Sequence, residues 1–244
     1  MIKIDINCDV GEGIGNEHLL MPLISSCNIA CGGHFGDEQT IDKTIQLALD
    51  NHLKIGAHPS FPDKENFGRK IMQISDDELE KSLQAQLELF CNRLQKANAK
   101  LHHIKPHGAL YNLIAANTQA ATHFINSIKK YTKEVFLYVP YNSAIEQVAL
   151  EHQIEIIYEA FADRNYTDDL LLVSRSKENA LITAPKKVFE HVLSIIKNER
   201  VVTITNAEVE IKAATFCVHG DNTRALDILK EVTQLLQAQN IQIV

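Results

Sequence analysis

The sequence lacks the features that would place it in a membrane, secretory or nucleic-acid-binding class. No apolar run among its 244 residues approaches the roughly 20 that span a bilayer, so no membrane association is expected. The first residues, Met1 to Asp5, do not form the apolar segment of a signal peptide, and we expect a cytoplasmic protein. The formal net charge is −7 and no basic cluster offsets it, which argues against nucleic acid as a partner.

Motifs for nucleotide binding and for serine nucleophiles are missing as well. The chain has no Gly-x-x-x-x-Gly-Lys-Ser/Thr loop and no Gly-x-Ser-x-Gly turn, which argues against a P-loop and against an esterase-type serine. Gly11, Gly13 and Gly15 form a Gly-x-Gly-x-Gly turn, but no amphipathic helix opens directly after it, so the indication of a dinucleotide site is weak. The five cysteines are odd in number and no second pair complements Cys27 and Cys31, so we predict buried, reduced thiols.

What the sequence does contain is a regular alternation of strand-like and helix-like segments. The composition, 45% hydrophobic and 23% charged, is that of an ordinary globular protein, and no linker divides residues 1–244, so one domain is expected. Strands are predicted at residues 2–10, 25–31, 54–57, 101–104, 135–139, 154–161 and 214–218, with a hairpin at 200–212. Helices are predicted at residues 38–52, 76–97, 118–131, 145–152, 185–196 and from 222 onward, the second opening with a capping box at Ser75 and Glu78.

This alternation predicts an α/β fold with parallel strands and right-handed crossovers. About seven strand–helix units in a chain of this length fit an irregular TIM-like barrel, and a doubly wound open sheet is the alternative. Either architecture places ligands at the carboxyl ends of the strands. The long polar stretch from Pro59 to Gln73 is typical of a functional lid or binding loop.

Polar side chains follow most of the predicted strands at the point where each strand ends. They are Asn7, Asp9 and Glu12; Asn28, His34 and Asp37; His58; His103, Lys105 and His107; Glu159, Asp163, Arg164 and Arg175; and His219 and Asp221. If the strands are parallel, these side chains converge on one rim. Their recurrence at the same topological position, rather than any one residue, defines the candidate site.

Two kinds of chemistry use such a set. A divalent metal held by Asp and His lowers the pKa of a bound water to about 7 and generates a hydroxide nucleophile. In metal-free acid–base catalysis, carboxylates and imidazoles transfer protons while Lys or Arg offsets the developing negative charge. Both predict hydrolysis, or a related addition, at a carbonyl or amide.

Each of these residues also has a purely structural interpretation. A single histidine in such a loop is more often a hydrogen-bonded structural residue than a ligand. Asp37 and Asp221 could cap helices, and Lys105 could be a solvated charge at a strand end. Arg164 could form an ordinary surface pair with Asp163.

Several motifs resemble those of the LamB/YcsF family. They are Asp-Ile-Asn-Cys-Asp-Val-Gly-Glu-Gly at residues 5–13, Asn-Ile-Ala-Cys-Gly-Gly-His at 28–34, Gly-Ala-His-Pro-Ser-Phe-Pro-Asp at 56–63 and Lys-Pro-His-Gly-Ala-Leu-Tyr-Asn at 105–112. Residues 159–164 and 217–221 extend the resemblance over nearly the whole chain, with the motifs in the same order. The chain departs from the family pattern at Phe35, where the family usually has alanine, and at Asp169, where it tends to have glycine.

The resemblance implies an irregular, seven-stranded TIM-like barrel similar to the glycoside hydrolase/deacetylase superfamily. It also implies a component of a 5-oxoprolinase, which opens the lactam of 5-oxo-L-proline to L-glutamate with hydrolysis of ATP, together with partner subunits B and C. ATP would be a cosubstrate bound largely by the partners, because this chain has no P-loop. The resemblance does not decide whether the protein binds a divalent metal or forms a homo-oligomer.

The residues are assigned on this basis as follows. Candidates for catalysis are Asp9, Glu12, His34, His58, Lys105, His107, His219 and Asp221; candidates for substrate binding are Asn7, Asn28, Glu159, Asp163, Arg164 and Arg175; a metal would be held by Asp9, His34 and His58.

The hypothesis for the reaction gives each group a role. Asp9 or a neighbouring histidine activates water, Lys105 with His107 stabilises the oxyanion, and Arg164 or Arg175 grips the substrate carboxylate. The rival hypotheses are a stand-alone metal-dependent deacetylase or amidohydrolase, and a non-catalytic scaffold that binds a lactam.

Overall fold

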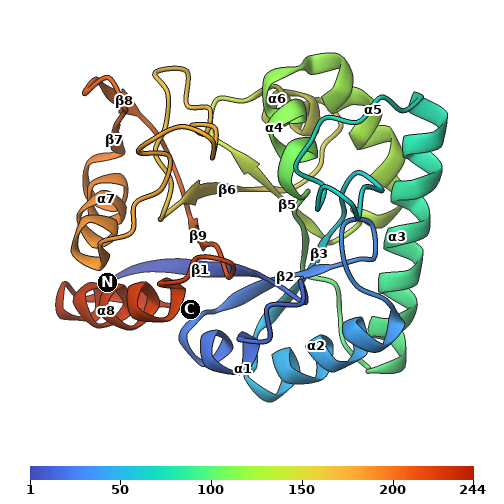
Figure 1. The fold of residues 1–244 in the computed structure, drawn as a ribbon, viewed down its shortest axis with the longest axis horizontal. Coiled ribbons are helices and arrows are strands. Elements are labelled where there is room, and N and C mark those ends of the chain that lie inside the picture. The colour runs from blue at the N-terminus through green and yellow to red at the C-terminus, as the bar shows by residue number, and fades with distance from the viewer.

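Seven parallel strands close into a barrel in the computed structural model, which describes residues 1–244 (Figure 1). The strands are β1 (Ile2–Val10), β2 (Ser26–Ala30), β3 (Lys54–His58), β4 (His103–Ile104), β5 (Phe136–Pro140), β6 (Ile156–Phe161) and β9 (Thr215–Val218). They pair in this order, and β9 pairs back onto β1. The closed ring confirms the predicted irregular barrel and rules out the open sheet.

Helices alternate with the strands and lie around the outside of the barrel (Figure 1). They are α1 (Glu17–Leu20), α2 (Glu38–Asp50), α3 (Asp76–Lys96), α4 (Gly108–Ala116), α5 (Thr118–Ile128), α6 (Ala144–Glu151), α7 (Pro185–Asn198) and α8 (Ala225–Ala238), with 3-10 turns η1 (Met21–Leu23) and η2 (Lys129–Tyr131). The capping box at Ser75 and Glu78 is confirmed, with both reciprocal hydrogen bonds present. A cluster of 56 buried hydrophobic residues fills the space that these elements enclose and forms the core.

Three elements are not predicted by the sequence patterns. Strand β10 (Ile241–Ile243) pairs in parallel with the first residues of β1, so the two chain ends lie close together (Figure 1). Helix α1 is a single turn after the glycine-rich loop, and α4 begins directly at Gly108. The predicted hairpin is confirmed as the antiparallel strands β7 (Arg200–Val202) and β8 (Glu208–Glu210).

The inside of the barrel is polar, whereas barrels of this class are usually filled with Val, Ile and Leu. Alternate residues of β1, namely Asp5, Asn7 and Asp9, share one face of the strand and are buried. They bond to buried polar side chains of the other strands, and to Lys105, which directly follows β4; the strand residues are Ser26, Asn28, Glu159 and Thr215. The polar half of the β1 pattern therefore marks the interior of the barrel, not a surface that faces water.

Gly56 of β3 is required by this interior. A Cβ atom at residue 56 would lie 2.1 Å from Nε2 of His103, a fully buried nitrogen that bonds Oδ1 of Asn28 at 2.7 Å. We expect Gly56→Ala to lower the free energy of unfolding by about 1–3 kcal/mol, because the His103 ring must leave its hydrogen bond to make room. Denaturant unfolding measures the change. The same substitution in a His103→Ala background should cost much less, and equal costs in both backgrounds would contradict the clash.

Candidate active site

A cavity of about 370 Å³ opens at the carboxyl ends of the barrel strands. Its size lies within the range of about 300–1,000 Å³ that is typical of small-molecule sites. Only six of the 21 residues in its wall are hydrophobic, so polar residue types outnumber hydrophobic ones there. The wall comes from the segments that follow β1, β3, β4, β6 and β9, as the barrel fold predicts.

Lys105 forms part of the cavity floor and is only 1% exposed. Its ammonium nitrogen lies 2.9 Å from Oδ1 of Asp9, 2.9 Å from Oε1 of Glu159 and 3.0 Å from Sγ of Cys217. An ammonium group has three N–H donors, and Lys105 donates hydrogen bonds to Asp9, to Cys217 and to Oδ1 of Asn7 at 3.3 Å, while Glu159 adds an ion pair. In this structure Lys105 is therefore the counter-ion of two buried carboxylates rather than a free donor.

The charges around Lys105 fix the ionisation of the floor. Burial alone would lower the pKa of Lys105, but Asp9, Cys217 and Glu159 raise it well above its usual value. Burial alone would raise the pKa of Asp9, but His58 and Lys105 bring it well below its usual value. The pKa of the Cys217 thiol is raised well above its usual value by burial and by Asp9. At neutral pH the floor therefore holds a charged Lys–Asp pair beside a neutral thiol.

Three buried histidines surround the carboxylate of Glu12. Oε1 of Glu12 lies 2.8 Å from Nε2 of His34, 3.3 Å from Nδ1 of His107 and 3.9 Å from Nε2 of His58. The rings of His34 and His107 stack with their centroids 3.7 Å apart. Burial lowers the pKa of His34, and burial together with the other two histidines lowers that of His107 well below its usual value. The neutral imidazole is thus favoured for these two residues.

Backbone carbonyls orient the His58 and His107 rings. Nδ1 of His58 lies 2.7 Å from the Lys105 oxygen, and Nε2 of His107 lies 3.0 Å from the Phe67 oxygen. A carbonyl can only accept, so each of these two nitrogens carries a hydrogen. The remaining nitrogens of the two rings face each other at 2.9 Å. Two bare nitrogens repel at this distance, so the pair needs a cation between them, either a shared proton or a divalent metal.

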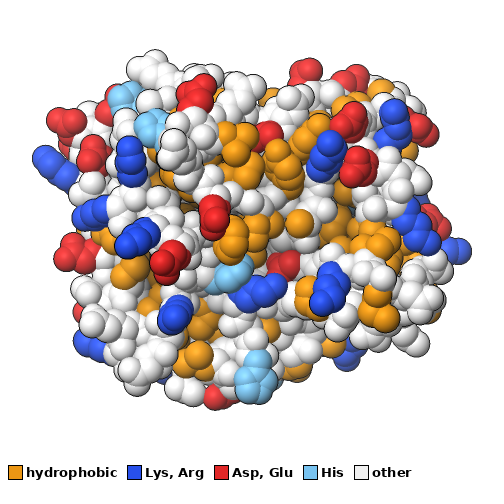
Figure 2. Space-filling model, turned by 180° about the vertical axis from the view of Figure 1, so that it is seen from behind, with side chains coloured by type: hydrophobic (Ala, Val, Ile, Leu, Met, Phe, Trp, Pro, Cys, Tyr) orange, Lys and Arg blue, Asp and Glu red, His pale blue; other side chains and the backbone are white.

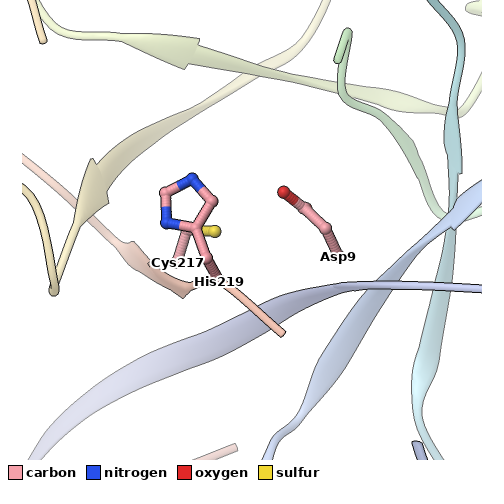
Figure 3. A group of neighbouring side chains, drawn as sticks. All are labelled: Asp9, Cys217 and His219. Carbon is pink, nitrogen blue, oxygen red and sulfur yellow. The ribbon is translucent and has the colours of Figure 1, made fainter. Parts of the chain in front are cut away.

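His219 and Asp163 form a dyad beside the floor. Nδ1 of His219 donates to Oδ1 of Asp163 at 2.8 Å, and Oδ2 of Asp163 accepts from Asn222 at 3.1 Å. Burial would raise the pKa of Asp163, but His219 and these hydrogen bonds lower it. Figure 3 shows the carboxyl group of Asp9, on β1, pointing toward His219 and Cys217. With Nδ1 engaged, His219 keeps Nε2 free for a ligand, which is the arrangement of a general base.

Two arginines and one carboxylate form the outer rim of the cavity. Asp221 accepts hydrogen bonds from Arg69 and from Arg175, the latter at 2.8 Å. Arg164 lies deeper and is 5% exposed, and its guanidinium donates to the Val173 oxygen at 2.5 Å. Arg164 therefore holds the loop after β6, while Arg69 and Arg175 are the more accessible cations.

The structure arranges the predicted site residues in two layers. Nine of them line the cavity: Asp9, Glu12, His58, Lys105, His107, Arg164, Arg175, His219 and Asp221. The others, apart from Asp37, lie behind the wall and bond to residues within it or to one another: Asn7, Asn28, His34, His103, Glu159 and Asp163. The predicted substrate contacts of Asn7, Asn28, Glu159 and Asp163 would therefore be indirect, made through the groups that these residues orient.

Three side chains that bear on the chemistry of the site, two in the wall and one beneath it, are missing from the sequence prediction. Arg69 lies in the long polar stretch from Pro59 to Gln73, which we predict to be a functional loop, so the sequence indicates the segment but not the residue. Tyr111 lines the cavity with a buried hydroxyl that has no hydrogen-bond partner, and burial and Glu159 raise its pKa well above its usual value. Cys217 sits in an apolar strand, and nothing in the sequence indicates its contact with Lys105.

The departures from the family pattern are accommodated locally. The ring of Phe35 covers Gly13, where a Cβ atom would lie 2.4 Å from it. Asp168, beside the substituted position, accepts hydrogen bonds from the Thr203 and Thr205 hydroxyls at 2.5 and 2.6 Å, which ties the loop after β6 to the β7–β8 hairpin.

The helix-cap interpretation of Asp37 is confirmed. Its side chain accepts a hydrogen bond from the Thr40 N–H at the start of α2. Asp37 is absent from the cavity wall, so the structure gives it a local structural role.

Two groups of side chains have potential metal-ligand atoms within 4.8 Å of one another: Asp9, Cys217 and His219, and Glu12, His34 and His107. The predicted trio of Asp9, His34 and His58 is not one of them, because His34 turns its Nε2 to Glu12. The first group does not fit a divalent metal, since the Lys105 ammonium already contacts Asp9 and Cys217.

The second group fits a divalent metal better. It offers one carboxylate and two imidazoles, and His58 stands beside them. The outer nitrogens of His58 and His107 donate to carbonyls, as those of metal-bound histidines commonly do.

The outer surface carries charges of both signs. On the face drawn in Figure 2, lysines and arginines are interspersed with acidic residues around a central band of hydrophobic side chains, and they do not merge into one basic surface. None of the helices is both long and apolar enough to span a membrane.

Comparison with known proteins gives matches along the full length. The sequence model of the LamB/YcsF family matches residues 4–244. The chain is 38% identical over 249 residues to the A component of 5-oxoprolinase from Bacillus cereus (strain B4264), covering 100% of this chain and 98% of that protein. The crystal structure of the lactam utilization protein from Thermus thermophilus superposes with a TM-score of 0.92 at 30% identity and covers 99% of both chains. A GH18 chitinase from Pseudoalteromonas aurantia, 7% identical over 94% of this chain and 99% of its own, shares the fold with a TM-score of 0.54.

Proposed function

Because the chain belongs to the LamB/YcsF family, we propose that it is the ring-opening component of an ATP-dependent 5-oxoprolinase. In this reaction the lactam of 5-oxo-L-proline is hydrolysed to L-glutamate, with partner subunits B and C taking part. The names of the relatives, a 5-oxoprolinase component and a lactam utilization protein, support the proposal. The observation that carries it is the cavity itself, whose floor holds acid–base groups and whose rim holds two arginines, as a small anionic lactam requires.

A role for ATP fits the chemistry of the substrate. Resonance stabilises a lactam amide against attack by water, so the carbonyl has to be activated first. This chain has no P-loop, so ATP would bind mainly to the partner subunits. This chain would then add water to the activated carbonyl carbon and break the ring C–N bond.

His219 is the best candidate for the base that activates water. Asp163 holds Nδ1 of His219 in the protonated form, so Nε2 can accept a proton and the resulting imidazolium is stabilised. Asp9 is less suited, because its Oδ1 already accepts hydrogen bonds from Lys105 and Asn28.

Other groups of the wall match the remaining steps. A proton shared by His58 and His107 would serve as the acid for the ring nitrogen that leaves. The neutral Tyr111 hydroxyl is available to the developing oxyanion. The oxyanion role predicted for Lys105 would require its ammonium to release a partner, so we assign Lys105 to the charge balance of the floor.

Glutamate release from 5-oxo-L-proline tests this function. The purified chain is mixed with ATP, with the partner subunits, or with both. We expect glutamate only when all three are present. No release from the complete mixture would contradict the proposal.

The second candidate is a stand-alone metal-dependent deacetylase or amidohydrolase, which the Glu12, His34 and His107 cluster favours. A metal held there would supply an activated water. We expect the ring-opening activity to survive treatment of this chain with a chelator that is removed before ATP and Mg²⁺ are added, because its acid–base groups need no metal. Elemental analysis with activity measurements before and after chelation checks this. One tightly bound zinc ion per chain, with activity lost on its removal, would favour the second candidate.

A further inference from the structure

Arg69, Arg175 and Asp221 come from three different loops and meet at the mouth of the cavity. Arg69 follows β3, Arg175 follows β6 and Asp221 follows β9. Oδ2 of Asp221 accepts from both guanidinium groups, and its Oδ1 lies 3.5 Å from Nη2 of Arg175. All three residues line the cavity, so these ion pairs stand where a ligand would bind.

The charges at this mouth do not cancel. Two guanidinium groups share one carboxylate, and the buried Arg164 adds a third positive charge whose hydrogen-bond partners are backbone carbonyls. Deeper in the cavity the acidic groups predominate, because Asp9 and Glu159 share Lys105 and Glu12 faces histidines, so the positive excess is confined to the mouth. The mouth therefore carries an excess of positive charge that would attract an anion.

Both rim arginines keep unused donors. A guanidinium group has five N–H donors, yet Arg69 and Arg175 donate to no group other than Asp221. Their side chains are 39% and 32% exposed, against 15% for that of Asp221. An arginine with a purely structural role would be covered, as Arg164 is.

We propose that Arg69 and Arg175 bind an oxyanion of the ligand, and that Asp221 is an internal counter-ion which the ligand replaces. The inference rests on the proposed function for the identity of that oxyanion, which is the carboxylate of 5-oxo-L-proline or a phosphoryl group added during its activation. Guanidinium groups bind both kinds of oxyanion through paired N–H donors. Without a ligand, Asp221 keeps the two arginines positioned.

Arg69 also connects the mouth to the histidines of the cavity. Its guanidinium carbon lies 4.8 Å from the centre of the Phe67 ring, and the Phe67 oxygen lies 3.0 Å from Nε2 of His107. The next oxygen, of Gly68, accepts from the Ala109 N–H at 2.9 Å. Binding of an anion by Arg69 would therefore fix the same segment that orients His107.

Titration calorimetry on the full-length chain tests the inference without turnover or partner subunits. The ligands are 5-oxo-L-proline, 2-pyrrolidinone, which is the same ring without the carboxylate, and inorganic phosphate. The variants are Asp221→Asn, Arg69→Gln and Arg175→Gln. The matched controls, Asp42→Asn and Arg93→Gln, alter an Arg–Asp pair between α2 and α3 that lies outside the cavity.

We expect Asp221→Asn to bind at least one of the two anions about fivefold more tightly, because no carboxylate has to be displaced. Arg69→Gln and Arg175→Gln should each weaken the same anion about tenfold or more, while the control variants match the wild type. None of these substitutions should change the affinity for 2-pyrrolidinone, which has no carboxylate. A gain for 5-oxo-L-proline alone identifies the carboxylate as the bound group, and a gain for phosphate alone identifies a phosphoryl group.

Unchanged or weaker binding of both anions by Asp221→Asn would overturn the inference, since Asp221 would then only hold the arginines in place. Absence of anion binding in every variant would overturn it as well. The rim variants could change phosphate binding as expected while the reconstituted complex releases no glutamate. That result would contradict the proposed function but would still support anion binding by Arg69 and Arg175.

Discussion

Replacing Lys105 with methionine is expected to lower the free energy of unfolding by about 3–5 kcal/mol, the usual cost of removing one partner from a buried ion pair. The ammonium contacts Asp9 and Glu159, and both carboxylates are almost fully buried. Methionine fills a similar volume but leaves these two carboxylates side by side without a counter-charge. Denaturant unfolding at pH 7 measures the effect, and an unfolding free energy within about 1 kcal/mol of the wild type would contradict the role of Lys105.

Lys54 provides the matched control. Its ammonium lies 3.3 Å from Oδ1 of Asp5, but its side chain is 38% exposed. Lys54→Met should therefore cost less than about 1 kcal/mol, as exposed ion pairs do.

The pH dependence of the Lys105 variant gives a second test. The pKa of Asp9 is lowered in the folded state, so its contribution is present above its unfolded value of about 3.9 and is lost as the pH falls through the folded value. The pKa of Lys105 is raised, so its contribution is complete below about 10.4 and is lost as the pH rises through the folded value. Between about pH 5 and 9, the Asp9–Lys105 pair therefore does not make the free energy of unfolding depend on pH. In Lys105→Met, stability should rise as the pH falls from 7 to 5, because an unpaired carboxyl takes up a proton.

Replacing Asp163 with asparagine is expected to reduce kcat for glutamate release on the order of 10³- to 10⁴-fold, as the loss of the carboxylate does in histidine-based triads. An amide at this position neither fixes the Nδ1–H tautomer of His219 nor stabilises its imidazolium form. KM should change little, because Asp163 lies behind the cavity wall. Steady-state kinetics of the chain reconstituted with the proposed partner subunits checks both quantities.

Two further variants keep this prediction open to contradiction. Asn222→Ala removes the hydrogen bond to Oδ2 of Asp163, together with the bond that Oδ1 of Asn222 accepts from the Arg224 N–H, and should reduce kcat less than about tenfold. His219→Gln should lose about as much activity as Asp163→Asn, and the double variant should lose little more, because the two residues act as a unit. An Asp163→Asn protein that folds normally and keeps its kcat would show that the dyad is structural.

The sequence predicts the barrel well because short local patterns identify most of its helices and strands. The capping box at Ser75, the proline that opens α7 and the apolar stripes of the helices are all local patterns, and the structure confirms them. Strand β10 is different, since its three residues follow α8 almost directly and owe their conformation to pairing with β1. Tertiary contact, rather than local preference, makes it a strand.

The sequence also predicts which residues gather at the site, but not their partners. Parallel strands guarantee that Asp9, Lys105 and His219 reach the same rim, because their positions depend only on topology. The contact of Lys105 with Cys217 depends on strand register and ring closure, which the sequence does not reveal. Arg69 lies in a loop without periodicity, so its place at the rim depends on the folded path of that loop.

The hydrogen-bonded interior of the barrel limits which substitutions the site can accept. An apolar core accepts many side chains of similar volume, but a hydrogen bond has a direction and needs a complementary partner. Asn7 alone is bonded to Asn28, Glu159 and Thr215, so any single exchange there leaves partners unsatisfied on neighbouring strands. The inner residues can therefore change only as complete sets. Substrate preference can therefore change most easily by substitutions in the rim loops, which leave the hydrogen bonds of the barrel interior intact.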